Sequence, residues 1–534
     1  MTAKVYKSTS AQGPWDAIII GSGIGGLSSA ALLAKAGRRV LVLERHYVAG
    51  GFTHTFERKG YRWDVGIHYI GEVHRKNSVL RKVCDTISDG QLLWARMPEV
   101  YDRAVFGEDT YDFVAGRENL KARLKDYFPS EGRAIDDYFR IVDEAAGTAR
   151  GYFTEKVLPP FLAGVAGPIF QRKFLKYSDR TTWDVLSGIT RNAKLLGVLT
   201  TQYGDYGLPP KKSSFAVHAM VARHYFEGGN YPVGGSERIA ETIIPVIEKA
   251  GGCVLVKAEV ERILIDRNRA GGVRLAGGDE IRAPIVISDC GVPNTFGKLI
   301  SPEIAGRLGF LKKLKKVQPS CPHVCLYIGI KESAETLHLP KSNYWIYPGY
   351  DHDENLERFI RNEDAPLPVT YISFPSAKDP AWESSHPGRS TIEAVGFVPF
   401  EWFQKWSETG WMKRGDDYGS LKQRFTERLL EQVTRFVPQV KGRIDYHELS
   451  TPLSTKHFAN YDHGEIYGID HTPERFRLRW LRPRTPVKGL FLTGQDIVTV
   501  GFGGALMGGV LTASAILKQN MISEIFKRQP PNGS

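Results

Sequence analysis

A glycine cluster near the N-terminus constrains this chain more than any other feature. Residues 21–26 (GSGIGG) follow an apolar run, 17–20, and precede a stretch of small and apolar residues, 27–36, that Gly37 ends. The apolar run predicts a buried parallel strand, and the small-residue stretch predicts a helix. A second apolar run, 39–43, predicts the next strand. A G-x-G-x-x-G string between a strand and a helix is typical of a dinucleotide-binding unit.

The positions within this unit suit the phosphates and ribose of a dinucleotide. Gly21 permits the tight turn, Gly23 lets the backbone approach a pyrophosphate, and Gly26 brings the helix close to the strand. The helix N-terminus offers free N–H groups and a positive dipole end to the phosphates. Glu44 ends the second strand, where it could accept hydrogen bonds from ribose hydroxyls. We expect three neighbouring residues to contribute to the same site: Ser22, Gly25 and Arg45.

A second glycine turn indicates which dinucleotide binds. Gly50 and Gly51 follow Glu44 closely and precede the segment 52–55 (FTHT). A turn there would let the backbone approach the same pyrophosphate from the other side, which suits a cofactor that is buried lengthwise and held permanently. This arrangement resembles that of the two-dinucleotide-binding-domain flavoproteins, whose cofactor is FAD. We therefore expect FAD, with Gly50, Gly51 and Thr53 among its contacts.

The C-terminal region contains a second element that could face the ligand. Residues 489–493 (GLFLT) predict a short buried strand, and a glycine-rich turn at 501–504 and a small-residue helix at 505–517 follow. Asp496 could bond the ribityl chain or the phosphate region of FAD. We expect three glycines to line the same site: Gly494, Gly503 and Gly504. Taken alone, the pattern fits a capped buried helix equally well, but its pairing with the N-terminal unit favours the cofactor.

Four segments, in order along the chain, resemble the all-trans-retinol 13,14-reductases (retinol saturases) of the carotenoid desaturase and isomerase superfamily of FAD proteins. They are 50–71 (GGFTHTFERKGYRWDVGIHYIG), 177–182 (YSDRTT), 224–235 (HYFEGGNYPVGG) and 489–517 (GLFLTGQDIVTVGFGGALMGGVLTASAIL). The resemblance spans nearly the whole chain. It implies an α/β, two-dinucleotide-binding-domain flavoprotein with a Rossmann-like FAD domain and a discontinuous α+β substrate domain. It also implies that Gly66, Ile67 and His68 lie near the flavin and that the Val260 backbone contacts the adenine.

Length and changes of character along the chain predict how the two domains are interleaved. A chain of 534 residues is too long for one core. We assign residues 15–75, 215–300 and 441–528 to the FAD-binding domain. We assign two segments to a substrate- and membrane-facing domain. They are residues 76–214, which are rich in aromatic and basic residues with helical periodicity, and residues 301–440, which contain strand-like aromatic runs.

Charge, cysteines and hydropathy narrow the partners and the compartment. The formal net charge of +12 could serve nucleic acid, anionic lipid or solubility, but the chain has no zinc knuckle, ribonucleoprotein motif or basic recognition helix, so we expect no nucleic-acid partner. Five scattered cysteines predict neither a disulfide framework nor a metal site and favour a reducing compartment. Residues 1–15 have no apolar signal-peptide core, and no transmembrane helix is expected. We expect a cytoplasmic protein, free or peripheral on the inner face of a membrane.

Residues 157–177 (VLPPFLAGVAGPIFQRKFLKY) are the best candidate for membrane contact. An apolar stretch interrupted by proline and glycine precedes cations set beside aromatic residues. Apolar side chains in the acyl region with cations at the phosphate level suit attachment to one leaflet. The alternative is a buried loop and helix over the substrate cavity.

The chemistry that the resemblance implies belongs to the flavin, which passes hydride from N5 to one carbon of a conjugated double bond while a proton reaches the neighbouring carbon. His68 is the candidate catalytic residue, because an imidazole that titrates near neutrality could donate this proton. Alternatively, His68 only orients the flavin or the substrate. No second G-x-G-x-x-G unit follows a strand, so NAD(P)H is expected at most as a transient reductant.

Four functions remain open for such a chain. The first is a saturase that reduces one double bond of a retinoid, a carotenoid or another hydrophobic conjugated lipid. The second is a carotenoid cis–trans isomerase or desaturase of the same superfamily. The third is a flavin amine oxidase, against which the apolar character of the chain argues. The fourth is a non-enzymatic carrier of prenyl lipids, which would not need the intact glycine turns.

Overall fold

A six-stranded parallel sheet forms one half of the molecule, in the order β1–β11–β3–β2–β15–β21. The computed structural model describes residues 3–158 and 160–527, without the side chains of residues 160–166. The strands are β1 (Lys4–Val5), β2 (Ala17–Ile20), β3 (Val40–Leu43), β11 (Cys253–Val256), β15 (Val286–Ser288) and β21 (Leu490–Leu492). Because all neighbours run parallel, the carboxyl ends of β2, β3 and β15 meet at one edge.

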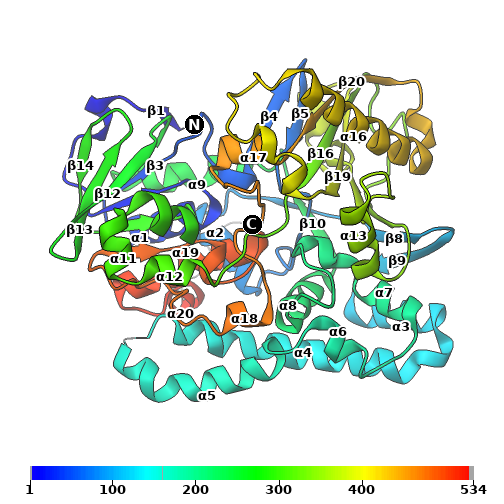
Figure 1. Cartoon of the computed structure of the whole chain (residues 1–534), viewed down its shortest axis with the longest axis horizontal. Coiled ribbons are helices and arrows are strands. Elements are labelled where there is room, and N and C mark those ends of the chain that lie inside the picture. Colours follow the sequence, from blue (N-terminus) through cyan, green and yellow to red (C-terminus); the bar gives the residue numbers. More distant parts are fainter. Residues whose placement is uncertain (1–2, 159, 528–534) are drawn as a thin grey trace.

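Three helices cover one face of this sheet, and two of them, α1 (Ile24–Lys35) and α19 (Gly501–Leu517), are rich in small residues. α1 packs between α9 (Arg238–Lys249) and α19. A Cβ at Gly509 of α19 would lie 1.8 Å from Ser28 Oγ of α1, so glycine is required for this close approach. A small antiparallel sheet of β12 (Val260–Asp266), β13 (Arg269–Leu275) and β14 (Glu280–Arg282) covers the other face (Figure 1). With both faces covered, the central strands are apolar throughout.

A seven-stranded mixed sheet forms the second half, in the order β20–β16–β19–β18–β17–β8–β9. Side chains alternate between its two faces, as the pleat requires. Ile346 contributes to the core beneath α16 (Gly415–Phe436), whereas Trp345 and Tyr347 point toward the opposite, aromatic core. The strands are β8 (Val100–Phe106), β9 (Asp109–Val114), β16 (His323–Ile330), β17 (Asn343–Tyr347), β18 (Thr370–Ser373), β19 (Ser390–Phe397) and β20 (Ile444–Ser450).

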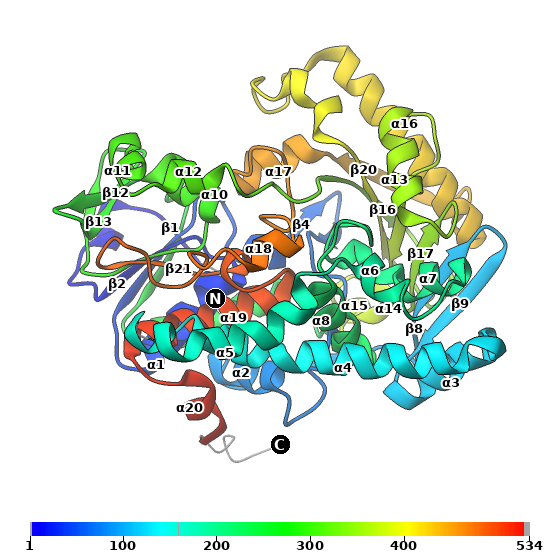
Figure 2. The ribbon, with the colours of Figure 1, turned by 60° about the horizontal axis from the view of Figure 1, so that its bottom comes forward.

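A layer of helices packs against the aromatic core. α4 (Gly132–Glu155) and α5 (Pro160–Ser178) run along the lower edge of the molecule in Figure 1 and across its front in Figure 2, and α8 (Phe215–Tyr225) packs on α4. Of the described helices, none is by itself long and apolar enough to cross a membrane. α19 and α20 (Met521–Lys527) reach the required length and hydropathy only as a pair bent by 99°.

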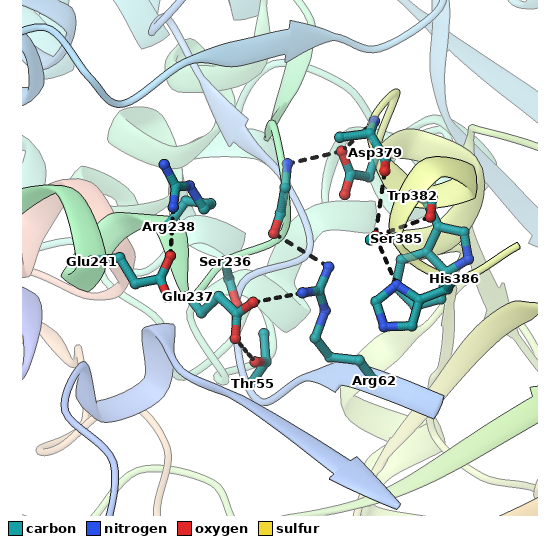
Figure 3. Close-up of polar contacts among 12 residues, drawn as sticks. Thr55, Arg62, Ser236, Glu237, Arg238, Glu241, Asp379, Trp382, Ser385 and His386 are labelled. Carbon is teal, nitrogen blue, oxygen red and sulfur yellow. Dashed lines mark hydrogen bonds and ion pairs between the residues drawn. The ribbon is translucent and has the colours of Figure 1, made fainter. Parts of the chain in front are cut away.

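Two short strands between the halves of the molecule contain the segment that follows the second glycine turn. β4 (Thr55–Arg58) and β5 (Tyr61–Asp64) form a hairpin beside the start of α9. Arg62 pairs with Glu237 at 2.6 Å, and the Thr55 hydroxyl donates to the same carboxylate (Figure 3). Arg62 also lies over the ring of Trp382, in the second half of the molecule, at 5.5 Å. These contacts fix residues 55–64 against both halves.

Two segments differ from the predicted domain assignment. Residues 441–528 are assigned to the FAD-binding domain, but β20 within them pairs with β16 in the seven-stranded sheet. Residues 215–300 are assigned to the same domain, but α8 packs on α4 of the helical layer. Both segments lie next to a point where the chain passes from one half of the molecule to the other. Neither contains a local sequence pattern that indicates its distant packing partner. The rest of the assignment stays a prediction.

Candidate functional site

A cavity of about 760 Å³ lies between the two halves, within the range of small-molecule sites in proteins. One end is formed by the glycine turns at the carboxyl edge of the parallel sheet, and the other end by aromatic side chains of the seven-stranded sheet. The following residues of the predicted site line it: Gly21, Gly23, Gly25, Glu44, Arg45, Gly50, Gly51, Thr53, Gly66, Ile67, His68, Val260, Gly494 and Asp496.

Three glycine elements meet at the N-terminus of α1. A Cβ at Gly51 would lie 2.9 Å from Gly23 Cα, and a Cβ at Gly25 would lie 2.6 Å from Gly494 Cα. Residues far apart in the sequence therefore converge with their backbones in near contact. Such a cradle leaves backbone N–H groups and the positive end of the α1 dipole available to a pyrophosphate, so the residues present fit a dinucleotide.

Ser22 acts from outside the cavity. Its backbone N–H and its hydroxyl both donate to Glu44 Oε2, at 2.9 and 2.7 Å, and its hydroxyl oxygen accepts from the Gly50 N–H at 3.0 Å. Ser22 thus holds the Glu44 carboxylate and the second glycine turn in place at the end of β3. Glu44 itself lines the cavity, as a group that binds ribose hydroxyls must.

Three predicted glycines do not line the cavity. Gly26 lies where a Cβ would come within 2.3 Å of Gly21 O, so its role is the close approach of helix and strand. Gly503 and Gly504 belong to α19, which begins at Gly501 and not after a turn at 501–504. A Cβ at Gly504 would lie 2.0 Å from Thr499 O, which explains the glycine by local packing. Neither of these two glycines lines the cavity, and their contact with the cofactor stays a prediction.

Asp496 lines the cavity, and its buried carboxylate also links two loops by hydrogen bonds. Its Oδ2 accepts from the Val292 N–H at 2.7 Å and its Oδ1 from the Ile469 N–H at 3.2 Å. The carboxylate therefore holds two loops at the rim of the cradle. A carboxylate has further lone pairs, so these bonds leave room for a ligand contact.

The sequence analysis missed Asp289, which follows β15. Its Oδ2 accepts from the Gly26 N–H at 2.8 Å, so the carboxyl group lies in the cradle at the N-terminus of α1. Burial, with smaller contributions from the charges of Glu44 and Asp496, raises the pKa of Asp289 to about 8. Its position was detectable, because residues that follow neighbouring parallel strands meet at the same edge of a sheet.

His68 lies at the junction of the two ends of the cavity. Lys378 Nζ donates to the His68 carbonyl at 2.6 Å, and His68 Nδ1 lies 2.9 Å from Glu393 Oε2 without hydrogen-bond geometry. Burial, followed by the charge of Lys378, lowers the pKa of His68 to about 3. The imidazole is therefore neutral near pH 7, and the expectation that it titrates near neutrality is wrong. Burial raises the pKa of Glu393 to about 8, although Lys378 opposes the shift.

The far end of the cavity is aromatic. Trp345 and Tyr371 line it with their ring centroids 4.4 Å apart, and Phe397 and Tyr467 extend the wall. Asp205 is the acidic residue among these rings. An apolar, aromatic wall suits a flat conjugated ligand, because stacking and burial both favour it.

The predicted membrane segment lies away from this cavity. None of the described residues in 157–177 lines it; residue 159 and the side chains of 160–166 lie outside the described part. On α5, Phe174 is buried and stacks on Tyr152 at 4.2 Å, whereas Ile169 and Phe170 are exposed. The segment therefore combines a buried face with an exposed apolar one, and no described residue connects it to the cavity.

Comparison with known proteins agrees with this geometry. Residues 19–87 match the family model of the NAD(P)-binding Rossmann-like domain. All-trans-retinol 13,14-reductase of Danio rerio is 40% identical over 532 residues, which cover 96% of this chain and 87% of that protein. Prolycopene isomerase 1 of an Oncidium hybrid cultivar is 25% identical, with 92% and 83% covered. Cyclohexylamine oxidase from Brevibacterium oxydans has a similar structure, with a TM-score of 0.60 at 17% identity and 97% and 100% covered. The chain thus has an α/β flavoprotein fold and belongs to the all-trans-retinol 13,14-reductase family.

Proposed function

We propose that this protein is an FAD-dependent oxidoreductase that reduces one carbon–carbon double bond of a retinoid or a similar conjugated lipid. One observation carries the proposal: the glycine cradle and the aromatic wall belong to a single cavity, with the segment 66–68 at their junction. A dinucleotide in the cradle and a polyene against the wall would therefore meet beside His68. The similarity to retinol 13,14-reductases over 96% of the chain supports the reaction and the substrate class.

The residues of the cavity would divide the work as follows. The glycine turns and the α1 N-terminus hold the pyrophosphate, and Glu44 binds the ribose. When bound, FAD supplies the hydride chemistry that no side chain can provide. Trp345 and Tyr371 hold the polyene flat and exclude water, so that the reacting carbons stay in one orientation. Neutral His68 orients the ligands by hydrogen bonding. Electrons would come from a transiently bound NAD(P)H or from another partner.

Isomerisation of a conjugated lipid is the second candidate. It is favoured by the similarity to prolycopene isomerase, which covers 92% of the chain. The same cavity could serve either reaction, since both need a polyene held against a flavin.

Product mass separates these reactions. The protein is to be produced in cells supplied with all-trans-retinol, and the extracted lipids analysed by mass spectrometry, with a Gly23→Val variant as the control that lacks the cradle. We expect a product that is heavier by two hydrogens with the wild-type protein alone. A product of unchanged mass and altered geometry would support the isomerase, and a product lighter by two hydrogens would support a desaturase. If the wild-type and Gly23→Val cells contain the same retinoids, the proposal is contradicted for this substrate class.

We also propose that the protein binds a membrane surface, where such a lipid resides, as a cytoplasmic peripheral protein. Support comes from α5, on which exposed Ile169 and Phe170 lie beside the exposed cations Arg172, Lys173 and Lys176. Apolar side chains flanked by cations are the surface that an anionic bilayer attracts.

A further inference from the structure

Two carboxyl groups share one tyrosine beside the aromatic end of the cavity. The Tyr69 hydroxyl lies 2.9 Å from Asp102 Oδ2 and 3.0 Å from Asp205 Oδ2. Asp102 lies in β8, and Asp205 ends the short helix η4 (Thr201–Asp205). Tyr69 is itself fixed by stacking on Tyr225 at 4.3 Å. Tyr69 and Asp102 are buried and Asp205 is half-buried, so the three polar groups form one rigid cluster with one member at its edge.

Asp102 has the partners of an ionised carboxylate. Its Oδ1 accepts from Asn343 Nδ2 at 2.9 Å, and its Oδ2 accepts from Gln202 Nε2 at 3.0 Å in addition to the Tyr69 hydroxyl. Burial raises the pKa of Asp102, and the three neutral donors that converge on this group oppose the shift, because donors stabilise the charged form. Asp102 is fully buried and does not line the cavity.

The hydrogen bonds of Tyr69 indicate that Asp205, unlike Asp102, is protonated. The Tyr69 hydroxyl carries one proton, and an ionised carboxylate can only accept. If Tyr69 donates to Asp102, then its oxygen faces Asp205 Oδ2 with a lone pair, and the contact of 3.0 Å is favourable only when Asp205 carries a proton. Burial, and then the charge of Asp102, raise the pKa of Asp205 well above its usual range, in agreement with this state. Of the described residues, no cation contributes to this shift, and only the hydrogen bond from Tyr69 opposes it.

Asp205 is also the member of the cluster that faces the cavity. It lines the cavity together with Gly204, Trp345, Tyr371 and Tyr467. The other described carboxyl groups that line the cavity belong to the cradle or to the rim: Glu44, Glu259, Asp289, Glu448 and Asp496. The titratable side chains that face Asp205 are Asp102 and a set of tyrosines whose pKa values are raised well above 10: Tyr69, Tyr101, Tyr206, Tyr225, Tyr347, Tyr371 and Tyr467.

We propose that Asp205 is the proton donor of double-bond reduction, a role that rests on the proposed function. Reduced FAD, when bound, would supply a hydride to one carbon of the double bond, and the π electron pair would take the Asp205 carboxyl proton at the neighbouring carbon. The double bond becomes a single bond with two new hydrogens, the flavin is oxidised by two electrons, and Asp205 is left as a carboxylate. Tyr69 stabilises this carboxylate by turning its hydroxyl toward it, and water restores the proton before the next turnover.

His68 and Asp205, the two polar residues near the reacting double bond, have different roles. His68 is neutral and orients, whereas Asp205 holds a transferable proton at neutral pH without a titrating imidazole. A carboxyl group kept protonated by an apolar site is an established means of acid catalysis near pH 7.

Single-turnover kinetics tests the role directly. FAD-loaded wild type, Asp205→Asn, Asp205→Glu and the control Asp353→Asn are to be reduced without oxygen and mixed with all-trans-retinol, with flavin reoxidation followed by absorbance. Asp353 is a suitable control because it is a buried carboxyl group that does not line the cavity. We expect Asp205→Asn to be slower by about 10²-fold or more, Asp205→Glu to recover part of the loss, and Asp353→Asn to match the wild type.

The pH profile distinguishes a proton donor from a merely structural group. The wild-type rate should fall as pH rises through the Asp205 pKa, whereas the residual Asp205→Asn rate should be independent of pH over the same range. Infrared spectroscopy adds a readout that needs no substrate. Asp289 and Glu393, whose pKa values are about 8, contribute protonated-carboxyl bands to every variant. The difference spectrum of wild type minus Asp205→Asn at neutral pH should contain one further such band, and that of wild type minus Asp353→Asn should lack it. An Asp205→Asn rate and pH profile equal to those of the wild type would overturn the role of Asp205. No reoxidation in the wild type would instead contradict the proposed function, and the infrared band would still decide whether Asp205 is protonated. If Asp205→Asn does not fold, the pH profile of Asp205→Glu decides, because its carboxyl group must still titrate.

Discussion

At the residue scale, single glycines explain why the cradle exists. Gly23 faces Asp289, and a Cβ added to it would lie 2.6 Å from Asp289 Oδ2, within the space that a pyrophosphate needs. We expect Gly23→Val to fold and to purify without bound FAD, as judged by circular dichroism and by the flavin absorbance. Gly147→Val is a matched control, because Gly147 is exposed on α4 and a Cβ there meets no atom within 4 Å. A folded Gly23→Val protein that is fully loaded with FAD would refute the cradle.

Asp289 makes the cradle sensitive to pH. Its pKa in the folded protein is about 8, above the ordinary value of 3.8. Folding therefore favours the protonated form, and the stability that is present below pH 3.8 is lost as pH rises through about 8. We expect apo Asp289→Asn to gain stability over the wild type as pH increases, by roughly 1 kcal/mol or more at the alkaline end. Thermal melting from about pH 5 to about pH 9 measures this difference; a constant difference would contradict the shifted pKa.

His68 should matter less than its position suggests. A pKa of about 3 leaves the imidazole neutral near pH 7, so it has no cationic proton to donate. We expect His68→Ala to slow flavin reoxidation by polyene less than about 10-fold, well below the loss for a general acid. Rapid mixing of the reduced variant with all-trans-retinol measures it. A loss of about 10²-fold or more would restore His68 as the proton donor.

The residues that sequence analysis found and missed differ in one physical respect. The roles predicted for Gly21, Gly23 and Glu44 rest on a local strand–turn–helix unit, so their spacing alone indicated them. Asp205 acquires its role only because Tyr69 and Asp102 come to lie beside it, from elements far apart in the chain. No local pattern contains that juxtaposition, and the lowered pKa of His68 likewise depends on Lys378 from a distant helix.

At the scale of elements, α5 is the surface whose function is most open to test. Its exposed residues Ile169 and Phe170 are 65% and 38% accessible, and cations flank them. We expect the double variant Ile169→Ser, Phe170→Ser to lose most of its pelleting with anionic liposomes, because each buried apolar side chain contributes roughly 1.5–3 kcal/mol. Ile360→Ser on α13 (His352–Arg361) is the control, since Ile360 is 47% exposed on another helix. Equal pelleting of both variants would place the membrane contact elsewhere.

Elements with strong local periodicity were predictable, and those defined by distant partners were not. The predicted strands at 17–20, 39–43 and 489–493 and the predicted helix at 27–36 agree with β2, β3, β21 and α1. The start of α19 was placed too late, because four residues that include three glycines read as a turn when the packing of α19 on α1 is unknown. β20 is an edge strand with a half-buried pattern, and its partner β16 lies more than a hundred residues earlier.

At the scale of the whole molecule, function depends on how two sheets share one cavity. The parallel sheet presents backbone N–H groups and a helix dipole, which suit a charged dinucleotide. The mixed sheet presents aromatic rings, which suit an apolar polyene. The chain crosses between the two halves several times, so each half is completed by distant segments. The family resemblance indicated this arrangement, whereas composition alone established only that more than one core was needed.

The stoichiometry of a single turnover tests the central claim most directly. The FAD-loaded protein is to be reduced without oxygen, mixed with all-trans-retinol in excess, and followed by flavin absorbance and by the mass of the extracted lipid. The account predicts that one double bond is saturated for each flavin reoxidised, with a gain of two hydrogens in the product. A flavin that stays reduced while the polyene returns with unchanged mass, whether or not its geometry has changed, would contradict the account.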